Sequence, residues 1–279
     1  MTYAKAAAYG RTVLQQQEIS DAQNDAWLLL AMVCQIDRNF YYLHAMEEMP
    51  QEQWESYQDL LRRRAEHVPL QYLTGEQEFM GHPFLVNPGV LIPRQDTEIL
   101  VEEALKVAAD GMTVLDLCTG SGCIIISIAK AVPGIAAVAS DLSGDAVAMA
   151  EENARRNGVS VKFETGNLFE PLTGTYDLIV SNPPYIRTSE IAELMPEVRD
   201  FEPEMALDGR EDGLFFYRTI IEEAENYLNP GGYLMFEIGY DQGEAVSELM
   251  RQAGYQEVTV IKDLAGLDRV VTGKEIEHV

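Results

Sequence analysis

The segment YDLIVSNPPY, residues 176–185, indicates the fold of the chain. Its first half is a short apolar run rich in branched side chains, which is typical of a buried strand. The two prolines lack an N–H and have a fixed φ, so the chain leaves the sheet at Asn182 in a stiff, extended bend. Open α/β sheets bind ligands at such strand ends, and an asparagine amide can both donate and accept there. An ordinary strand-ending turn would also explain an Asn-Pro pair.

The composition is that of a globular protein with one large domain and a small one. The chain has 279 residues, of which 47% are hydrophobic and 24% charged. No apolar run approaches the roughly 20 residues that span a bilayer, and the first residues do not resemble a secretion signal. The three cysteines (Cys34, Cys118 and Cys123) suggest neither a disulfide framework nor a zinc site. We therefore expect a cytoplasmic protein with no membrane association and no metal.

The formal net charge of −26 argues against a nucleic-acid substrate. A protein that holds a duplex by its phosphates needs a basic face. The only dense basic cluster is Arg62–Arg64, which we interpret as the solvated face and last turn of a helix. A basic protein partner fits the charge better.

Residues 1–72 contain no convincing strand and are interpreted as a small helical domain. A capping box is expected at residues 20–23, before an apolar helical stretch at residues 27–36. Further helices are expected at residues 3–17 and 51–67. Residues 73–95 then form a β-hairpin or extended connector. Asp96 or Thr97 is expected to cap a helix that runs to about residue 109.

Residues 96–279 form the third part, in which strands and helices alternate. This pattern is the signature of a largely parallel, doubly wound sheet. Strands are expected at residues 113–117, 136–140, 161–164, 176–180 and 233–238, and two more at 257–261 and 269–272. Helices are expected at residues 122–131, 145–157, 214–228 and 242–253.

The loop DLCTGSG, residues 116–122, follows the first of these strands and carries two glycines that allow a tight turn close to a ligand. The G-x-G-x-x-G fingerprint of dinucleotide-binding folds is not matched here, because Ile125 stands at the position of its third glycine. Asp141 ends the second strand, where a carboxylate can accept both hydroxyls of a ribose. After the third strand, Asn167 can bond an adenine edge and Leu168 can pack on its face. These features describe a nucleoside pocket without strong phosphate binding, which fits S-adenosylmethionine.

With these motifs the chain resembles the class I S-adenosylmethionine-dependent methyltransferases, and more closely the bacterial release factor glutamine methyltransferase family. The resemblance covers essentially the whole chain. It implies an α/β, Rossmann-like domain with a seven-stranded, mostly parallel sheet, a small N-terminal helical domain and a β-hairpin connector. The motifs that carry it, besides the helical domain, lie at residues 91–98, 116–122, 182–185, 199–203, 237–239 and 263–269.

The resemblance implies methyl transfer to the side-chain amide nitrogen of the glutamine in a release factor's Gly-Gly-Gln motif. The N-terminal domain then docks the release factor, and the protein is expected to be a monomer. The implied catalytic residues are Asn182, Pro183, Pro184 and Tyr185. The implied cofactor-binding residues are Cys118, Thr119, Gly120, Ser121, Gly122, Asp141, Asn167, Leu168 and Asn182.

Two positions depart from the pattern of the family. Cys118 stands where a glycine is common, and either tolerates the backbone angles required there or packs beneath the methionine part of the cofactor. Asn167 stands where an aspartate is common, so it keeps hydrogen-bonding capacity but loses a charge.

Two other functions compete with this interpretation. The NPPY motif is shared with enzymes that methylate exocyclic amines of adenine or cytosine, so a DNA or RNA methyltransferase is the first alternative. The net charge and the absence of an obvious target-recognition domain count against it. A non-catalytic protein that keeps the fold as a cofactor sensor is the second, and the intact motif at residues 182–185 argues against that.

Overall fold

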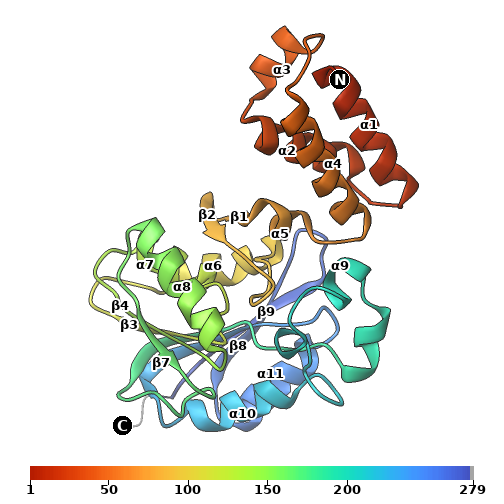
Figure 1. Ribbon diagram of the computed structural model, residues 1–279. Helices are drawn as coiled ribbons and strands as arrows, with labels where there is room; N and C mark the ends of the chain where they lie inside the picture. The colour runs from red at the N-terminus through yellow and green to blue at the C-terminus, as the bar shows by residue number, and fades with distance from the viewer. Residues whose placement is uncertain (277–279) are drawn as a thin grey trace. The chain divides into compact units, whose positions relative to one another are not determined.

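The computed structural model describes residues 1–276, which divide into two compact units. The first unit holds residues 1–75 together with residues 195–201, and the second holds the other described residues. Figure 1 follows the chain from the red N-terminal helices to the blue C-terminal strands. Within residues 1–276, no helix has both the length and the apolarity needed to cross a membrane.

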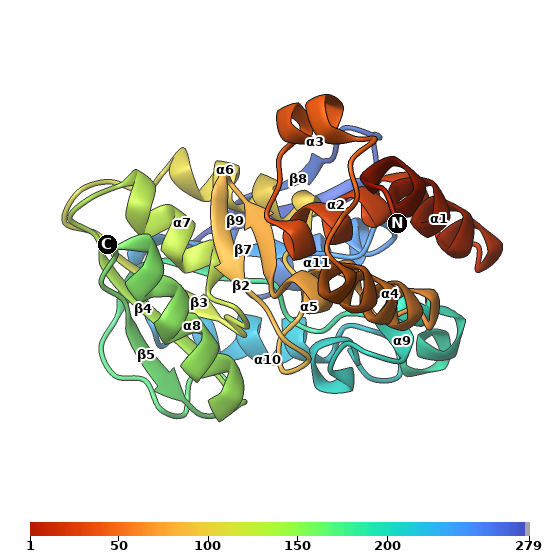
Figure 2. The same ribbon diagram turned by 45° about the horizontal axis from the view of Figure 1, so that its top comes forward.

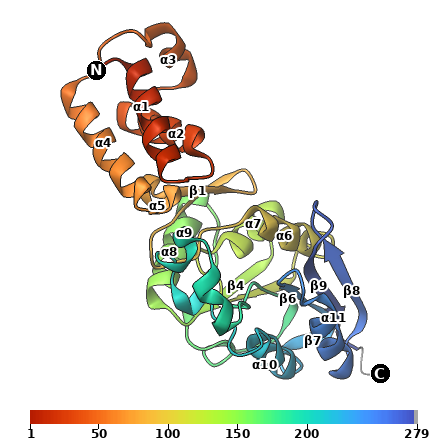
Figure 3. The same ribbon diagram turned by 90° about the vertical axis from the view of Figure 1, so that its right-hand side faces the viewer.

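The first unit is a helical bundle with its own core. Helices α1, α2 and α4 pack against one another in it (Figure 3). Gly10 allows the close approach of α1 and α4, because a Cβ there would lie 2.0 Å from the Tyr57 hydroxyl oxygen. That hydroxyl donates to the Ala26 carbonyl of α2 at 2.9 Å. The helices of this unit are α1 (Tyr3–Gln16), α2 (Ala22–Cys34), α3 (Arg38–His44), α4 (Gln51–Ala65), α5 (Leu70–Thr74) and the later α9 (Pro196–Arg199).

The start of α2 differs from the expected capping box. The N-cap residue is Asp21, and its side chain makes no capping hydrogen bond. The helix begins at Ala22, five residues earlier than the apolar pattern indicates, because Ala22 and Asp25 are also buried in this unit. It ends at Cys34, where Gln35 takes a left-handed φ of 53°. The short helices α3 and α5 were not predicted, since neither is long enough to show a periodic pattern.

The interpretation of Arg62–Arg64 as a solvated face is wrong for Arg64. These residues do form the last turn of α4, but the Arg64 side chain is only 7% exposed. Its Nε donates to Asp25 at 2.8 Å, and its Nη1 lies 3.2 Å from Glu197 of α9. Burial raises the pKa of Asp25, and the hydrogen bond from Arg64 opposes that rise. Arg64 therefore joins α2 and α4 to the distant segment at residues 195–201.

The second unit confirms the predicted fold class. Strands β1 (Glu76–Phe79) and β2 (His82–Leu85) form an antiparallel hairpin, visible in Figure 2. A seven-stranded sheet follows, in the order β5-β4-β3-β6-β7-β9-β8. All neighbouring strands are parallel except those that pair with β9. The strands are β3 (Thr113–Leu117), β4 (Ala136–Asp141), β5 (Lys162–Thr165), β6 (Tyr176–Ser181), β7 (Leu228–Glu237), β8 (Gln256–Lys262) and β9 (Asp268–Lys274).

Helices cover both faces of this sheet (Figure 1). Along β6, Leu178 and Val180 join the core beneath α6, α7 and α8, and Ile179 between them joins the core beneath α10 and α11. This alternation follows from the two-residue period of a strand. The helices are α6 (Glu98–Leu105), α7 (Cys123–Ala131), α8 (Gly144–Asn157), α10 (Phe215–Ala224) and α11 (Gly243–Gln252), with short 3-10 turns at Gln95–Thr97, Thr188–Glu193 and Glu204–Ala206.

The helix expected after Asp96 or Thr97 differs in its cap and its length. Thr97 already has helical backbone angles, and neither it nor the residues before it make a side-chain cap. Helix α6 ends at Leu105, four residues before the expected end. Strand β7 begins at Leu228, five residues earlier than expected, because Leu228 pairs with Tyr176 before an irregularity in the register.

We predict that Arg64→Ala destabilises the first unit by about 3–5 kcal/mol, because it leaves the buried carboxylate of Asp25 without its cation. Arg62→Ala is the matched control, since Arg62 lies in the same turn but pairs with exposed acids. Urea unfolding followed by tryptophan fluorescence measures this unit specifically, because Trp27 and Trp54 are the only tryptophans of the chain. Equal midpoints for the two variants would contradict the role of Arg64.

Candidate active site

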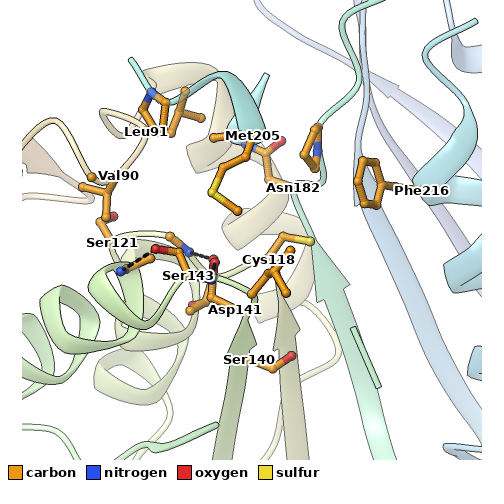
Figure 4. A pocket seen from close by; sticks show the side chains of 18 of the residues that line it. Val90, Leu91, Cys118, Ser121, Ser140, Asp141, Ser143, Asn182, Met205 and Phe216 are labelled. Carbon is orange, nitrogen blue, oxygen red and sulfur yellow. Dashed lines mark hydrogen bonds between the residues drawn. The ribbon is translucent and has the colours of Figure 1, made fainter. Parts of the chain in front are cut away.

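A cavity of about 390 Å³ lies at the carboxyl ends of β3, β4 and β6. The sheet order reverses between β3 and β6, and such switch points are where open α/β sheets bind ligands. The volume falls within the range of small-molecule sites. Figure 4 shows Cys118, Asp141 and Asn182 at these strand ends. The lining residues include Val90, Leu91, Arg94, Thr97, Cys118–Ser121, Ser140–Ser143, Asn167, Leu168, Asn182, Pro184, Pro203–Ala206, Asp208, Arg210 and Phe216.

The loop after β3 brings the backbone to this cavity. Cys118, Gly120 and Gly122 all have positive φ angles, of 59°, 54° and 79°. Cys118 thus tolerates the left-handed conformation that favours glycine. Gly122 caps α7, and a Cβ there would lie 2.9 Å from Ile126 and 3.0 Å from Ala150. The loop therefore turns sharply and packs tightly on α8 beneath it.

Asp141 at the tip of β4 is held by backbone groups. Its Oδ2 accepts from the Gly120 N–H at 2.8 Å, and its Oδ1 accepts from the Ser143 N–H at 2.9 Å. Burial raises the pKa of this carboxyl, and these backbone hydrogen bonds oppose the rise. A carboxylate has about four acceptor positions, so acceptor capacity remains for a ligand in the cavity.

Asp116, deeper in β3, orients the same loop. Its Oδ2 accepts from the Thr119 hydroxyl at 2.6 Å, while its buried Oδ1 has no hydrogen-bond partner among residues 1–276. Burial raises the pKa of Asp116 to about 7, against the effect of the Thr119 hydrogen bond. This carboxyl therefore titrates near neutral pH.

Asn182 stands where β6 leaves the sheet. Ser181 before it is buried, and its hydroxyl donates to the Leu117 carbonyl of β3 at 2.8 Å. The Asn182 Nδ2 donates to the Thr97 hydroxyl at 3.4 Å. Pro183 and Pro184 are both buried. The strand end is thus held by Ser181 and the buried prolines, and the Asn182 amide by its contact with Thr97.

Tyr185 points away from the cavity into the protein. Its hydroxyl donates to Glu237 Oε1 at 3.3 Å, and its carbonyl accepts from Gln242 at 3.0 Å. The backbone of Gly209 and Gly213 crosses it so closely that a Cβ at either position would lie within 2.7 Å of Tyr185 atoms. Burial, and next the charge of Glu237, raise the pKa of the Tyr185 phenol.

Two arginines form ion pairs that connect the segments around the cavity. Arg94 donates to both carboxylate oxygens of Glu202, at 2.6 and 2.7 Å. Burial raises the pKa of Glu202, and the charge of Arg94 opposes that rise. Arg269 lies 3.2 Å from Asp96 and 3.1 Å from Asp263. Motifs that are far apart in the sequence therefore meet around this site.

The structure brings most of the predicted site residues to one cavity. Cys118, Thr119, Gly120, Ser121, Asp141, Asn167, Leu168, Asn182 and Pro184 line it, whereas Gly122, Pro183 and Tyr185 do not. Sequence reasoning assigned no role to Arg94, and it assigned Thr97 only a role as a candidate helix cap, although the motif at residues 91–98 was noticed. Met205 and Phe216 also line the cavity, and no pattern in the sequence distinguishes them from ordinary core residues.

Two family models match the chain. The model described as "PrmC N-terminal domain" matches residues 5–75, and the model described as "Methyltransferase small domain" matches residues 94–197. Release factor glutamine methyltransferase of Geobacter sulfurreducens is 43% identical over 98% of this chain and 96% of its own length. The enzyme of that name from Clostridium acetobutylicum is 40% identical, over 93% of this chain and 94% of its own.

A solved methyltransferase structure from Pyrococcus furiosus shares the fold, with a TM-score of 0.55, 18% identity, and coverage of 77% of this chain and 98% of that one. The fold and the matched domain are those of a methyltransferase. With relatives this similar along almost its full length, the chain belongs to the release factor glutamine methyltransferase family.

We predict that Asp116→Asn changes how stability depends on pH. The native state holds a proton on Asp116 up to a pH of about 7, whereas the unfolded chain releases it near pH 4. The contribution of Asp116 to stability is therefore complete below about pH 4 and is lost as the pH rises through about 7. An asparagine there cannot titrate.

The thermal unfolding midpoints of the wild type and of Asp116→Asn, measured by calorimetry without ligand, test this prediction. The midpoint of the wild type minus that of the variant should fall by several degrees between about pH 5 and pH 8. A difference that does not change with pH would show that Asp116 does not titrate in this range.

Proposed function

We propose that this protein methylates the side-chain amide nitrogen of the glutamine in the Gly-Gly-Gln motif of peptide chain release factors, with S-adenosylmethionine as the methyl donor. The observation that carries the proposal is the rigid Asn-Pro-Pro-Tyr exit of β6 beside a nucleoside-sized cavity, in a chain of this family. We also propose that the protein acts as a monomer. We further propose that it binds no nucleic acid stably, and the net charge of −26 supports this second point.

The residues around the cavity fit S-adenosylmethionine. We propose that Asp141 accepts the ribose hydroxyls with the acceptor capacity that its two backbone hydrogen bonds leave. Asn167 is exposed and Leu168 buried at the end of β5, as an adenine edge and an adenine face would require. The loop at residues 118–122 offers close backbone approach, since three of its five residues have positive φ. Bound S-adenosylmethionine supplies a methyl group on a sulfonium, which is a good leaving group.

An amide nitrogen is a poor nucleophile, because its lone pair is delocalised into the carbonyl. We propose that the Asn182 Oδ1 and the Pro183 carbonyl each accept one N–H of the substrate amide. These acceptors orient the nitrogen and raise its electron density. The nitrogen becomes more acidic as it is methylated, so the same acceptors bind the transition state better than the ground state.

The remaining residues of the motif act by keeping these acceptors rigid. Both prolines are buried, and the Tyr185 hydroxyl is anchored to Glu237. Pro184 lines the cavity, so it can contact the substrate directly. Tyr185, whose side chain is turned into the protein, acts through this anchor and does not pack on the substrate amide as the sequence suggested.

We predict that Asn182→Ala lowers kcat by two orders of magnitude or more, because an acceptor that acts mainly in the transition state is removed. The dissociation constant for S-adenosylmethionine should change by less than about threefold. Single-turnover methylation of purified release factor and calorimetric titration of the cofactor measure the two effects. Near-normal turnover of the variant would exclude Asn182 from the reaction.

We further propose that the helical domain at residues 1–72 docks the release factor. Around the end of α3, the apolar side chains of Tyr42, Leu43 and Met46 are 73%, 80% and 80% exposed. Such residues are suited to contact with a protein.

We predict that Leu43→Glu combined with Met46→Glu raises KM for the intact factor by about tenfold, the effect of losing two moderate interface contacts. Kinetics with a short peptide that contains Gly-Gly-Gln should not change, since such a peptide lacks the parts of the factor that would dock on the helices. Leu264→Glu, at a fully exposed leucine of the second unit, is the control. Equal changes for factor and peptide would contradict docking by this surface.

A further inference from the structure

We propose that Thr97 and Glu237 are positioning residues that fix which end of the Asn182 amide faces the substrate. This inference rests on the proposed function, because it explains how Asn182 presents an acceptor rather than a donor. An asparagine side chain has an oxygen and an NH₂ group of nearly equal size. If the side-chain amide were rotated by 180°, its NH₂ group would face the N–H groups of the substrate. Two sets of donors would then oppose each other, and substrate binding would be unfavourable.

The contact between Asn182 and Thr97 is the first step of the argument. The Nδ2 of Asn182 donates to the Thr97 hydroxyl at 3.4 Å. Thr97 is 2% exposed, and its hydroxyl makes no cap to α6, although it lies at the start of that helix. The hydroxyl is therefore buried at a position where the helix does not use it.

The second step is the direction in which Thr97 donates. A hydroxyl has one proton to give and can accept with its lone pairs. After it accepts from Asn182, that proton still needs an acceptor. The Thr97 hydroxyl opposes the rise in the pKa of Glu237 that burial causes, and the Oε2 atom of Glu237 is buried without a hydrogen-bond partner among the described residues.

The third step is that Glu237 fixes the direction of the whole chain of hydrogen bonds. An ionised carboxylate only accepts. Glu237 accepts from Tyr185 through Oε1, and its buried Oε2 accepts no hydrogen bond from residues 1–276. In our proposal the Thr97 proton is directed to this unpartnered oxygen, so that a donor of Asn182 faces Thr97. The oxygen of Asn182 is left for the substrate.

An ion pair that only stabilises the fold does not explain why Glu237 is buried. It is 1% exposed, and burying a carboxylate is costly unless it is paired. Arg269, whose charge lowers the pKa of Glu237, lies within ion-pair distance of Asp96 and Asp263 instead. Among the described residues, Tyr185 donates to the Glu237 side chain, and the Thr97 hydroxyl lowers its pKa. Both lead directly to the motif at residues 182–185.

Thr97→Val tests the proposal, because valine keeps the shape of threonine and removes only the hydroxyl. We expect kcat on the release factor to fall about five- to tenfold, the factor that one lost hydrogen bond produces. The dissociation constant for S-adenosylmethionine and the thermal midpoint should stay close to those of the wild type. Thr97→Ser, which restores the hydroxyl, should recover most of the lost kcat.

Glu237→Gln tests the direction of the hydrogen bonds. A glutamine can donate to Thr97 as well as accept, so the orientation of Asn182 is no longer fixed, and kcat should fall at least as far as in Thr97→Val. Ser247→Ala is the control, since Ser247 is buried in α11 and its hydroxyl has no partner among the described residues.

The possible results distinguish a failure of the proposed function from a failure of the proposed roles of Thr97 and Glu237. If the wild type does not methylate the release factor, the proposed function fails and this inference with it. If the wild type is active and Thr97→Val matches it, the proposed function stands and the inference is wrong. If Thr97→Ser loses as much kcat as Thr97→Val, side-chain packing rather than the hydroxyl is responsible, and the inference is also wrong.

Discussion

The exit of β6 at Asn182 is the constraint on which the rest of the site depends. Strand β6 lies inside the sheet, paired with β3 on one side and β7 on the other, so its end cannot shift without disturbing both neighbours. Two buried prolines then remove the freedom that a loop would otherwise have there. The reaction that we propose needs acceptors held at fixed positions and needs no charged catalytic group, and a rigid strand exit provides that.

Buried or partly buried carboxyl groups lie around this exit in a strongly acidic chain. Asp116, Asp141, Glu202 and Glu237 all have their pKa raised, in each case chiefly by burial. Each is bonded to a group that positions the cavity: a loop hydroxyl, loop N–H groups, an arginine or a tyrosine of the motif. These carboxyls therefore contribute to the geometry of the site more than to the net charge of the surface. Their cost in stability is the physical reason to expect that they have a function.

The sequence predicted the sheet and the motif well, because both depend on local patterns. The limits of β3 were predicted to the residue, and the apolar run before Asn182 is a strand. The role of Arg64 could not be predicted, because its partners Asp25 and Glu197 are 39 and 133 residues away. The same holds for Thr97: a threonine at the start of a helix indicates a cap, and only the fold reveals that its hydroxyl faces Asn182. Met205 and Phe216 reach the cavity through tertiary packing alone.

The most direct test of the account is a methyl-transfer assay with labelled S-adenosylmethionine, purified release factor, the variant of that factor with alanine in place of the Gly-Gly-Gln glutamine, and a nucleic-acid control. The account predicts label on the wild-type factor and none on the variant factor or the nucleic acid. Label on the nucleic acid with none on the factor would contradict the proposed substrate, although the fold and the cofactor cavity would stand.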